Sequence, residues 1–301
     1  MMATATLPET RGKLTADAPL APLVWFKTGG PAQWLFEPKD LSDLQNFLRS
    51  LPADIIVWPL GLGSNLIIRD GGKGGVIIRL GKAFSGITLH SDDPEMIVSG
   101  AGAPGISAAS FARDNGLAGT EFLRGIPGTI GGAVRMNAGA YGREMCDILV
   151  SADVVLRDGS LQTVSLDDMG YSYRHSNLPE DAIVISATLR ASPGDKDAIT
   201  AEMKRIADER EASQPLRTKT GGSTFKNPDG HKAWQLVDEA GCRGLKMGQA
   251  QVSEKHCNFL LNLGGATSAD IEALGDEVRR RVKEHSGVEL HWEIQRVGDE
   301  I

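Results

Sequence analysis

Cysteine is scarce in this sequence, and the three that occur, Cys146, Cys242 and Cys257, are not spaced as metal ligands. An odd number of scattered cysteines offers no disulfide framework, so a reducing cytoplasm and no bound metal are expected. No apolar run approaches the roughly 18 residues of a membrane span. Residues 1–22 lack an apolar signal-peptide core and are rich in Ala, Thr and Pro, which predicts a flexible N-terminal arm.

Positive charge is also in short supply, because 32 Lys and Arg face 39 Asp and Glu, for a net charge of −7. Nucleic-acid-binding domains are usually basic, so no nucleic-acid partner is expected, and no membrane partner either. The phosphate-binding pattern G-x-x-x-x-G-K-[ST] and the hydrolase pattern G-x-S-x-G are both absent. With 41% hydrophobic and 24% charged residues, the composition is that of a soluble globular protein.

Glycine, in contrast, is abundant: 36 of 301 residues are glycine, about 12%, whereas the average in proteins is roughly 7%. The excess gathers in segments 61–72, 100–105 and 125–142. Glycines after a strand let backbone N–H groups face an anion, although a tight turn is the default interpretation of any one segment alone. The stretch "GAGAPG" matches G-x-G-x-x-G, but no second strand of a convincing βαβ unit bears an acidic residue about 20 positions on, as a dinucleotide site would require. Three such segments together favour a phosphate-bearing cofactor.

Local patterns predict an α+β protein. Runs of β-branched residues bounded by Gly, Asp or Pro predict strands at 54–59, 75–80, 96–102, 147–156, 160–165 and 182–191. Apolar spacing of three and four residues predicts helices at 40–51, 106–115, 198–213, 233–240 and 268–286. Residues 288–297 alternate strictly, which predicts a terminal strand with Glu293 on its polar face.

Ser223 lies in "TKTGGSTFKNPDG" behind two glycines. Its local sequence leaves three roles open: nucleophile, phosphate ligand or turn residue. The first two lack their usual motifs, so the local pattern favours the turn.

Five blocks in order resemble the UDP-N-acetylenolpyruvoylglucosamine reductase family, flavoproteins of peptidoglycan precursor synthesis. They are "GLGSNLIIRDGG", "GIPGTIGGAVRMNAGAYG", "YSYRHSNL", "GGSTFKNP" and "HWEIQRVG". The resemblance implies a two-subdomain FAD-binding fold of the vanillyl-alcohol oxidase type and a smaller C-terminal α/β substrate domain. We expect the arm at 1–22, the FAD-binding domain at 23–200 completed by 288–301, a helical connector at 201–214 and the substrate domain at 215–287.

The resemblance also implies the chemistry. FAD is expected to be bound non-covalently, NADPH to be the co-substrate, and UDP-N-acetylglucosamine enolpyruvate to be reduced to UDP-N-acetylmuramate. Hydride is expected to pass from flavin N5 to C3 of the enolpyruvyl group and a proton from Ser223 to C2, while Arg174 and Glu293 stabilise the enolate. Ser223 would then be a general acid.

Binding residues follow from the same blocks. For FAD they are Gly61, Leu62, Gly63, Ser64, Asn65, Gly125, Ile126, Pro127, Gly128, Gly131, Gly132, Asn137 and Gly139. For the substrate they are Tyr173, Lys219 and Asn227. The protein is expected to be a monomer whose partners are these small molecules.

The chain departs from the family's patterns in two places, the first of them a feature of the longer form. No tyrosine follows Tyr173, so the loop tyrosine that closes over the substrate is missing and the chain resembles the shorter form. Lys27-Thr28 stands where Asn-Thr is usual.

Two other functions compete with this reading. A flavin oxidase of the same fold often tethers FAD through His or Cys, and segments 61–72 and 125–142 contain neither. A nucleotide-sugar-binding protein without turnover would not need Arg174, Ser223 and Glu293 together.

Overall fold

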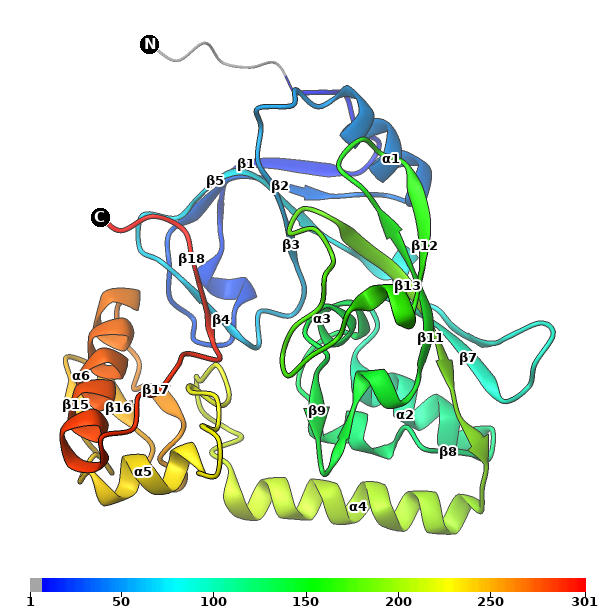
Figure 1. Ribbon diagram of the computed structural model, residues 1–301. Helices are drawn as coiled ribbons and strands as arrows, with labels where there is room; N and C mark the ends of the chain where they lie inside the picture. The colour runs from blue at the N-terminus through cyan, green and yellow to red at the C-terminus, as the bar shows by residue number, and fades with distance from the viewer. Residues whose placement is uncertain (1–6) are drawn as a thin grey trace. The chain divides into compact units, whose positions relative to one another are not determined.

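The computed structural model describes residues 7–301 and divides into two compact units (Figure 1). The first contains residues 1–16, 34–61 and 75–207, of which residues 7 onward are described, and the second contains 17–33, 62–74 and 208–301. Helix α4 (Lys196–Ser213) carries the chain from one to the other. Both units mix helices and strands, which confirms the α+β class.

One core of the first unit forms around α1 (Leu41–Ser50) and a mixed sheet. Asp40 begins the helix, because its carboxylate accepts a hydrogen bond from the Asp43 amide at 2.9 Å. The buried face of α1 includes Leu44 and Phe47, which join strand residues in one apolar cluster. The sheet has the order β1-β2-β5-β3, with bounds Lys13–Pro19, Pro31–Glu37, Lys73–Arg79 and Val57–Leu60.

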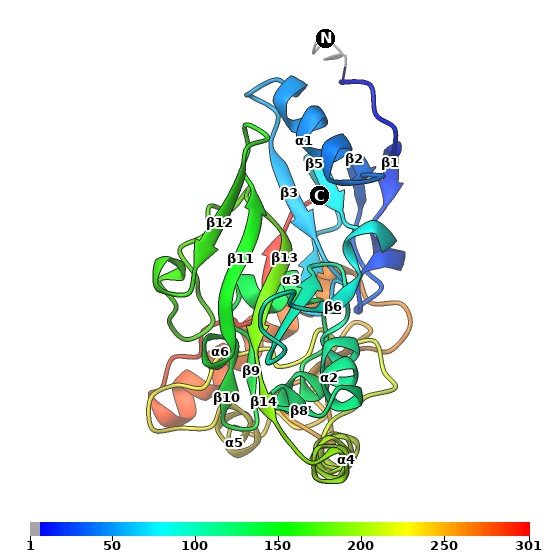
Figure 2. The same cartoon turned by 90° about the vertical axis from the view of Figure 1, so that its right-hand side faces the viewer.

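A second core in the same unit lies on an antiparallel sheet covered by α2 (Gly105–Asp114) and α3 (Ile130–Arg135) (Figure 2). Small side chains such as Ala108 and Ala133 allow the helices to pack closely on the strands. The sheet order is β12-β11-β13-β7-β6, with bounds Leu161–Ser165, Leu149–Val155, Ile183–Arg190, Met96–Gly100 and Ile87–Leu89. The first unit therefore has two subdomains.

Short elements complete the first unit. Its two-stranded pairs are β8 (Leu117–Ala118) with β14 (Ser192–Pro193) and β9 (Gly139–Ala140) with β10 (Arg143–Glu144). Its 3₁₀ helices are η2 (Lys82–Phe84), η3 (Glu121–Gly125), η4 (Met145–Asp147) and η5 (Asp167–Met169).

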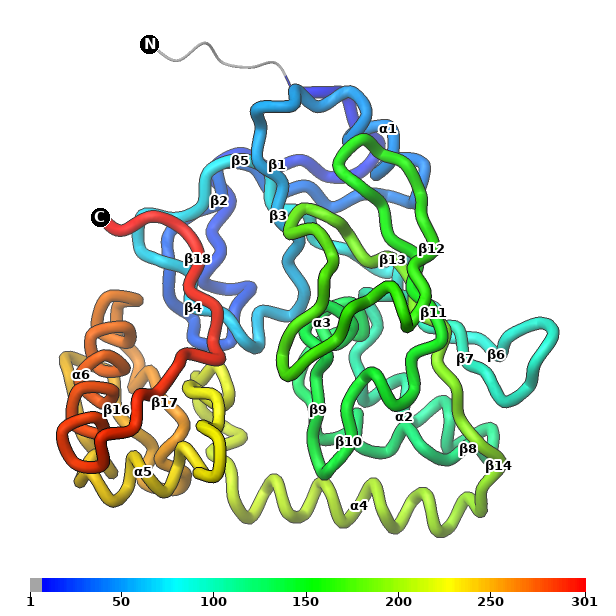
Figure 3. The backbone as a smooth tube through the Cα atoms, in the orientation of Figure 1, coloured from blue at the N-terminus to red at the C-terminus, as the bar shows by residue number. Residues whose placement is uncertain are grey.

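The second unit packs α5 (Ala233–Glu239) and α6 (Ser268–Ser286) with a three-stranded sheet in the order β15-β16-β17. These strands are Lys246–Met247, Ala250–Val252 and Leu260–Asn262. The unit also holds η1 (Ala21–Leu23) and a parallel pair, β4 (Leu66–Ile68) with β18 (Gln295–Val297), seen together in Figure 3.

Two sequence-based expectations are corrected by these elements. The terminal strand 288–297 is too long, because only Gln295–Val297 finds a strand partner; before it, Trp292 forms an isolated bridge with Phe225. The prediction of a flexible arm at 1–22 is wrong for the residues that form β1 and η1. Residues 1–6 of the predicted arm lie outside the described residues. Residues 11 and 12 are held in place because the Arg11 and Gly12 amides both donate to the Asp43 carboxylate at 2.8 Å, a contact that needs no apolar pattern.

Within residues 7–301, no helix is both long and apolar enough to cross a bilayer. The same part of the chain has no group of three or more His, Cys, Asp or Glu side chains arranged to hold a metal ion.

Candidate active site

Gly61 and the glycine-rich segments 100–105 and 125–142 meet within the first unit. Gly105 N–H donates to the Gly128 carbonyl at 3.2 Å, and Gly131 N–H donates to the Ala101 carbonyl at 2.9 Å. Gly61 lies against the Thr129 side chain, since a Cβ at Gly61 would stand 2.9 Å from the Thr129 hydroxyl. Segments that are up to 70 residues apart in the chain (61 to 131) therefore form one cluster.

Several of these glycines are explained by packing of the protein on itself. A Cβ at Gly131 would stand 2.9 Å from the Ala101 Cβ, and one at Gly125 would enter the Tyr141 ring at 2.5 Å. Thr129 begins α3 by accepting a hydrogen bond from Gly132 N–H at 3.3 Å. Glycine here allows loops to approach each other, which is a different reason from the anion contact that the sequence suggested.

Arg174 stands on a tight turn in the first unit with an unusual backbone. Ser172 and His175 pair with each other on either side of it, and Arg174 itself has φ +56°. This left-handed conformation favours glycine or asparagine and costs an arginine about 1–2 kcal/mol. A residue other than glycine in this conformation is a candidate for a functional role of its side chain.

The Arg174 guanidinium is held by the loop after α3. It donates to the Gly139 carbonyl at 3.0 Å, pairs with Glu144 at 3.4 Å and stacks over the Tyr173 ring at 4.7 Å. A Cβ at Gly139 would stand 3.3 Å from an Arg174 nitrogen, so glycine permits this approach. The side chain is 16% exposed and keeps its plane in a defined orientation.

Ser223 lies in the second unit on an extended segment fixed by Asn258. The Asn258 side chain accepts from Phe225 N–H and donates to the Phe225 carbonyl, both at 2.9 Å. Ser223 itself forms a backbone bridge with Phe259 and is half-buried. Among residues 7–301, none forms a hydrogen bond with the Ser223 hydroxyl, whereas a turn serine usually bonds to nearby backbone.

Glu293 runs beside the Ser223 segment in the same unit. Its N–H donates to the Thr224 carbonyl at 2.8 Å, and its own carbonyl accepts from the Asn65 side chain at 3.2 Å. Gln295 N–H donates to the Asn65 carbonyl at 3.1 Å. The glycine-loop residue Asn65, the Ser223 segment and Glu293 are thereby brought together by two main-chain hydrogen bonds and one from the Asn65 side chain.

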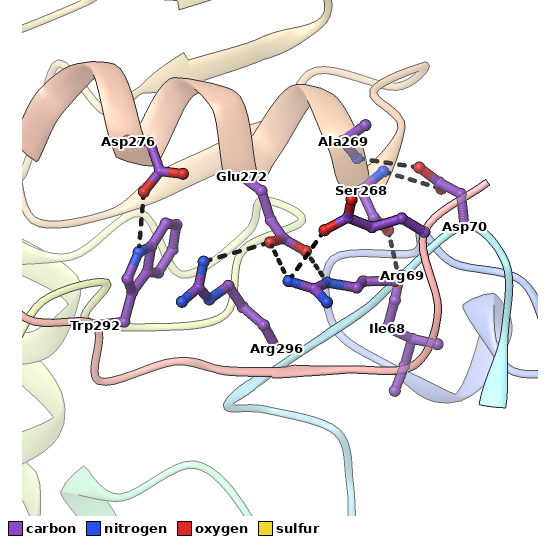
Figure 4. A network of polar contacts seen from close by, with 10 residues as sticks. Ile68, Arg69, Asp70, Ser268, Ala269, Glu272, Asp276, Trp292 and Arg296 are labelled. Atoms are coloured by element: carbon purple, nitrogen blue, oxygen red, sulfur yellow. Dashed lines mark hydrogen bonds and ion pairs between the residues drawn. The ribbon is translucent and has the colours of Figure 1, made fainter. Parts of the chain in front are cut away.

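Helix α6 fixes the two strands that lead away from this cluster (Figure 4). Asp70, just after β4, accepts from the Ser268 and Ala269 amides at 3.0 Å each, which caps the start of α6. Glu272, one turn later, pairs with Arg69 through two bonds of 2.9 and 3.1 Å. It also pairs with Arg296 of β18 at 3.5 Å.

We expect Glu272→Gln to lower the free energy of unfolding of the FAD-loaded protein by about 1.5–3 kcal/mol, the value of hydrogen bonds to charged groups. The carboxylate is 14% exposed, and its loss leaves two arginines without their shared partner. Urea denaturation would measure the change. Glu284→Gln, which breaks an exposed Arg280 pair on the same helix, is the control and should stay within about 0.5 kcal/mol of the parent. Equal effects of the two variants would contradict this account.

The expected substrate residues occupy different settings. Tyr173 is 44% exposed and lies under Arg174. Lys219 is exposed, and its backbone bridges to Asn262. Asn227 is exposed too, but its side-chain oxygen accepts from Ala233 N–H at 3.0 Å near the start of α5. Their contacts with a substrate stay predictions.

Sequence reasoning missed the residues that hold the candidate site in place. Asn137 was expected to bind cofactor, yet its side chain donates to Glu144 at 2.9 Å and accepts from Cys146 N–H at 2.9 Å. Glu144 and Asn258 carried no motif signal at all. Their roles are recognised only in the folded chain, where Glu144 contacts Arg174 and Asn258 contacts Phe225.

Comparison with known proteins defines the class of protein first. Residues 32–165 match the model of the FAD binding domain. With the two-subdomain fold, this makes the chain a flavoprotein oxidoreductase.

The remaining comparisons define the family. Residues 214–297 match the C-terminal domain of UDP-N-acetylenolpyruvoylglucosamine reductase. Reductases of that name from Sphingopyxis alaskensis and Novosphingobium aromaticivorans are 67% and 65% identical to the chain, over 99% and 96% of its length and 99% and 96% of theirs. The crystal structure of the Thermus caldophilus enzyme, 33% identical, covers 96% of this chain and 100% of its own with a TM-score of 0.82. The chain belongs to the UDP-N-acetylenolpyruvoylglucosamine reductase family.

The residues present fit a bound flavin. Thr28, Thr220 and Thr224 have buried hydroxyls that find no hydrogen-bond partner among residues 7–301. Such groups are costly unless a ligand or water completes them. Gly222, beside Ser223, has φ +81°, and a Cβ there would meet only the Ser64 carbonyl at 4.0 Å, so the backbone is open to close approach.

Proposed function

We propose that this enzyme reduces UDP-N-acetylglucosamine enolpyruvate to UDP-N-acetylmuramate with NADPH, in peptidoglycan precursor synthesis. The observation that carries the proposal is the pairing of the Ser223 segment with Glu293 and Asn65 in one unit. The names of the relatives support the same substrate. Cytoplasmic location and a monomeric state belong to the proposal too.

FAD, when bound, supplies the hydride chemistry: it is reduced by NADPH and reduces C3 of the enolpyruvyl group. The backbone of Gly61 to Asn65 and the segment from Gly125 to Gly139 would hold it. Within the first unit, Gly61, Gly105 and Gly128 belong to the cluster of converging loops, which supports this assignment. Residues 23–200 and 288–301 would form the FAD-binding part and 215–287 the substrate domain.

Ser223 would donate the proton that C2 requires. Reduction at C3 leaves electron density at C2, and a hydroxyl aimed at that carbon can deliver its proton directly. The Ser223 hydroxyl suits this role because no bond within residues 7–301 restrains it, while its backbone is fixed beside Phe259. Lys219 or Lys226 or a water would return the proton to Ser223.

Arg174 and Glu293 would stabilise the enolate that precedes proton transfer. The planar guanidinium can meet the substrate carboxylate with two parallel hydrogen bonds and is always charged. Glu293, in its neutral form, would donate a further hydrogen bond; a nearby anionic substrate favours that form. Fixed groups of this kind act strongly where water is excluded.

The proposal is tested by anaerobic spectroscopy of the purified enzyme. NADPH should bleach the flavin absorbance, and addition of the enolpyruvyl substrate without oxygen should restore it with formation of UDP-N-acetylmuramate. Bleaching without restoration by this substrate would remove the proposed reaction. Bleaching by NADH at an equal rate would remove only the preference for NADPH.

We expect FAD to be released intact when the protein is precipitated with acid. Segments 61–72 and 125–142 contain no His or Cys to tether it. The flavin absorbance of supernatant and pellet measures the outcome. Flavin that stays with the pellet would favour an oxidase of the same fold.

A further inference from the structure

We propose that Glu144 is a positioning residue for Arg174, which it holds in the orientation needed for enolate stabilisation. The inference rests on the proposed function, because it deepens the role given there to Arg174. Both residues lie in the first unit, and their ion pair joins Glu144 Oε1 to Arg174 Nη1 at 3.4 Å.

Arg174 needs such a partner because its turn alone does not fix it. Arg174 lies on a two-residue turn with a left-handed backbone. The backbone sets where the side chain starts, but a long arginine side chain has many rotamers, so its guanidinium needs other contacts to be held in one position. The carbonyls of Gly139 and Asn137 accept from its two terminal nitrogens at 3.0 and 3.5 Å. Glu144 adds the charged contact, the stronger kind of hydrogen bond for a guanidinium.

Glu144 is itself fixed from several directions. Its Oε2 accepts from the Asn137 side chain at 2.9 Å, and its carboxylate caps the start of η4. Its own N–H donates to Asp147 at 2.8 Å. A Cβ at Gly139 would stand 2.7 Å from Glu144 Cγ, so the glycine makes room for the carboxylate. A carboxylate held this way imposes its position on the arginine and not the reverse.

The block "NAGAYGRE", residues 137–144, thus positions the Arg174 guanidinium in addition to the cofactor contact proposed for it. Asn137, Gly139 and Glu144 all act on the same guanidinium from one short loop that also pairs β9 with β10. A displacement of about 1 Å in a group that contacts the reacting centre can slow a reaction by about a hundredfold. Glu144 therefore affects the chemical step without touching the substrate.

The experiment compares half-reactions of the FAD-loaded Glu144→Gln enzyme. Glutamine keeps the size but removes the charge and sets an amide against that of Asn137. We expect flavin reoxidation at saturating enolpyruvyl substrate to slow by about 10- to 100-fold. Reduction by NADPH and the affinity for UDP-N-acetylglucosamine, which lacks the enolpyruvyl carboxylate, should stay within about twofold. Glu144→Asp, which keeps the charge on a shorter stem, should lie between the two enzymes.

Glu121→Gln is the matched control, since the Glu121 carboxylate accepts from Gly119 N–H at 2.8 and 3.0 Å in the same unit without touching Arg174. It should leave both half-reactions unchanged. Normal reoxidation in both Glu144 variants would overturn the inference, as would equal slowing of both half-reactions.

A double variant separates this inference from the proposed function. If Glu144 acts through Arg174, Glu144→Gln should add no further slowing to Arg174→Lys. Independent, multiplying effects would overturn the positioning role while leaving Arg174 in the mechanism. Normal reoxidation in Arg174→Lys alone would instead remove the role of Arg174 in the proposed function.

Discussion

Ser223→Ala should slow flavin reoxidation by the enolpyruvyl substrate about 10²–10⁴-fold, the usual value of a positioned general acid. That corresponds to about 3–5 kcal/mol of barrier. Flavin reduction by NADPH should continue at close to the normal rate, because that half-reaction needs no proton at C2. Stopped-flow measurement of the two half-reactions distinguishes these outcomes.

The size of the effect depends on how little else Ser223 does. Its hydroxyl makes no hydrogen bond within residues 7–301, so alanine removes no structural contact that those residues supply. Phe225, two residues on, stays clamped by Asn258 in the variant. Stability should therefore change little, and the loss should appear in one half-reaction only.

Thr218→Val provides the control for a turn hydroxyl. Thr218 lies in the same loop, and its hydroxyl donates to the Pro215 carbonyl at 2.6 Å. Its loss should lower stability slightly and leave both half-reactions near normal. If Ser223→Ala resembles Thr218→Val, or slows both half-reactions equally, Ser223 is a turn residue and the proton comes from elsewhere.

Arg174→Lys should slow reoxidation by about 10²–10³-fold, the range seen when one group that stabilises developing charge is removed. Lysine has the same charge and the same unfavourable left-handed backbone, so folding should be affected less than turnover. Lysine lacks the planar guanidinium that stacks on the Tyr173 ring. It also lacks the two terminal nitrogens that contact Gly139 and Glu144 at the same time.

Arg113→Lys is the control for this substitution. Arg113 pairs with Asp114 near the end of α2, and its change should leave both half-reactions as they are. Comparable turnover in Arg174→Lys and Arg113→Lys would place Arg174 outside the reacting centre. The rate of reoxidation under single-turnover conditions is the measurement in each case.

Local patterns predicted most elements because the forces that form them are local. The helix at 268–286 was predicted residue for residue, since Thr267 caps its start and Gly287, with φ +75°, ends it. The strands at 149–155 and 183–190 lie within their predicted ranges because β-branched runs suit a half-buried sheet. The prediction that the whole segment 288–297 is a strand was wrong. Alternation indicates which side chains are buried, but it does not supply a partner strand.

The sequence by itself determined the α+β class, both ends of its longest helix, the clustering of glycine and, through five ordered motifs, the family. These depend on residue types and short spacings that a chain carries before it folds. Only the tertiary structure decided that Gly61 meets the other two glycine segments, that Asn65 and Glu293 meet, and that Glu144 contacts Arg174 on a left-handed turn. Such contacts join residues far apart in the chain or depend on a backbone angle, and no local pattern specifies either because they arise from the packing of whole elements.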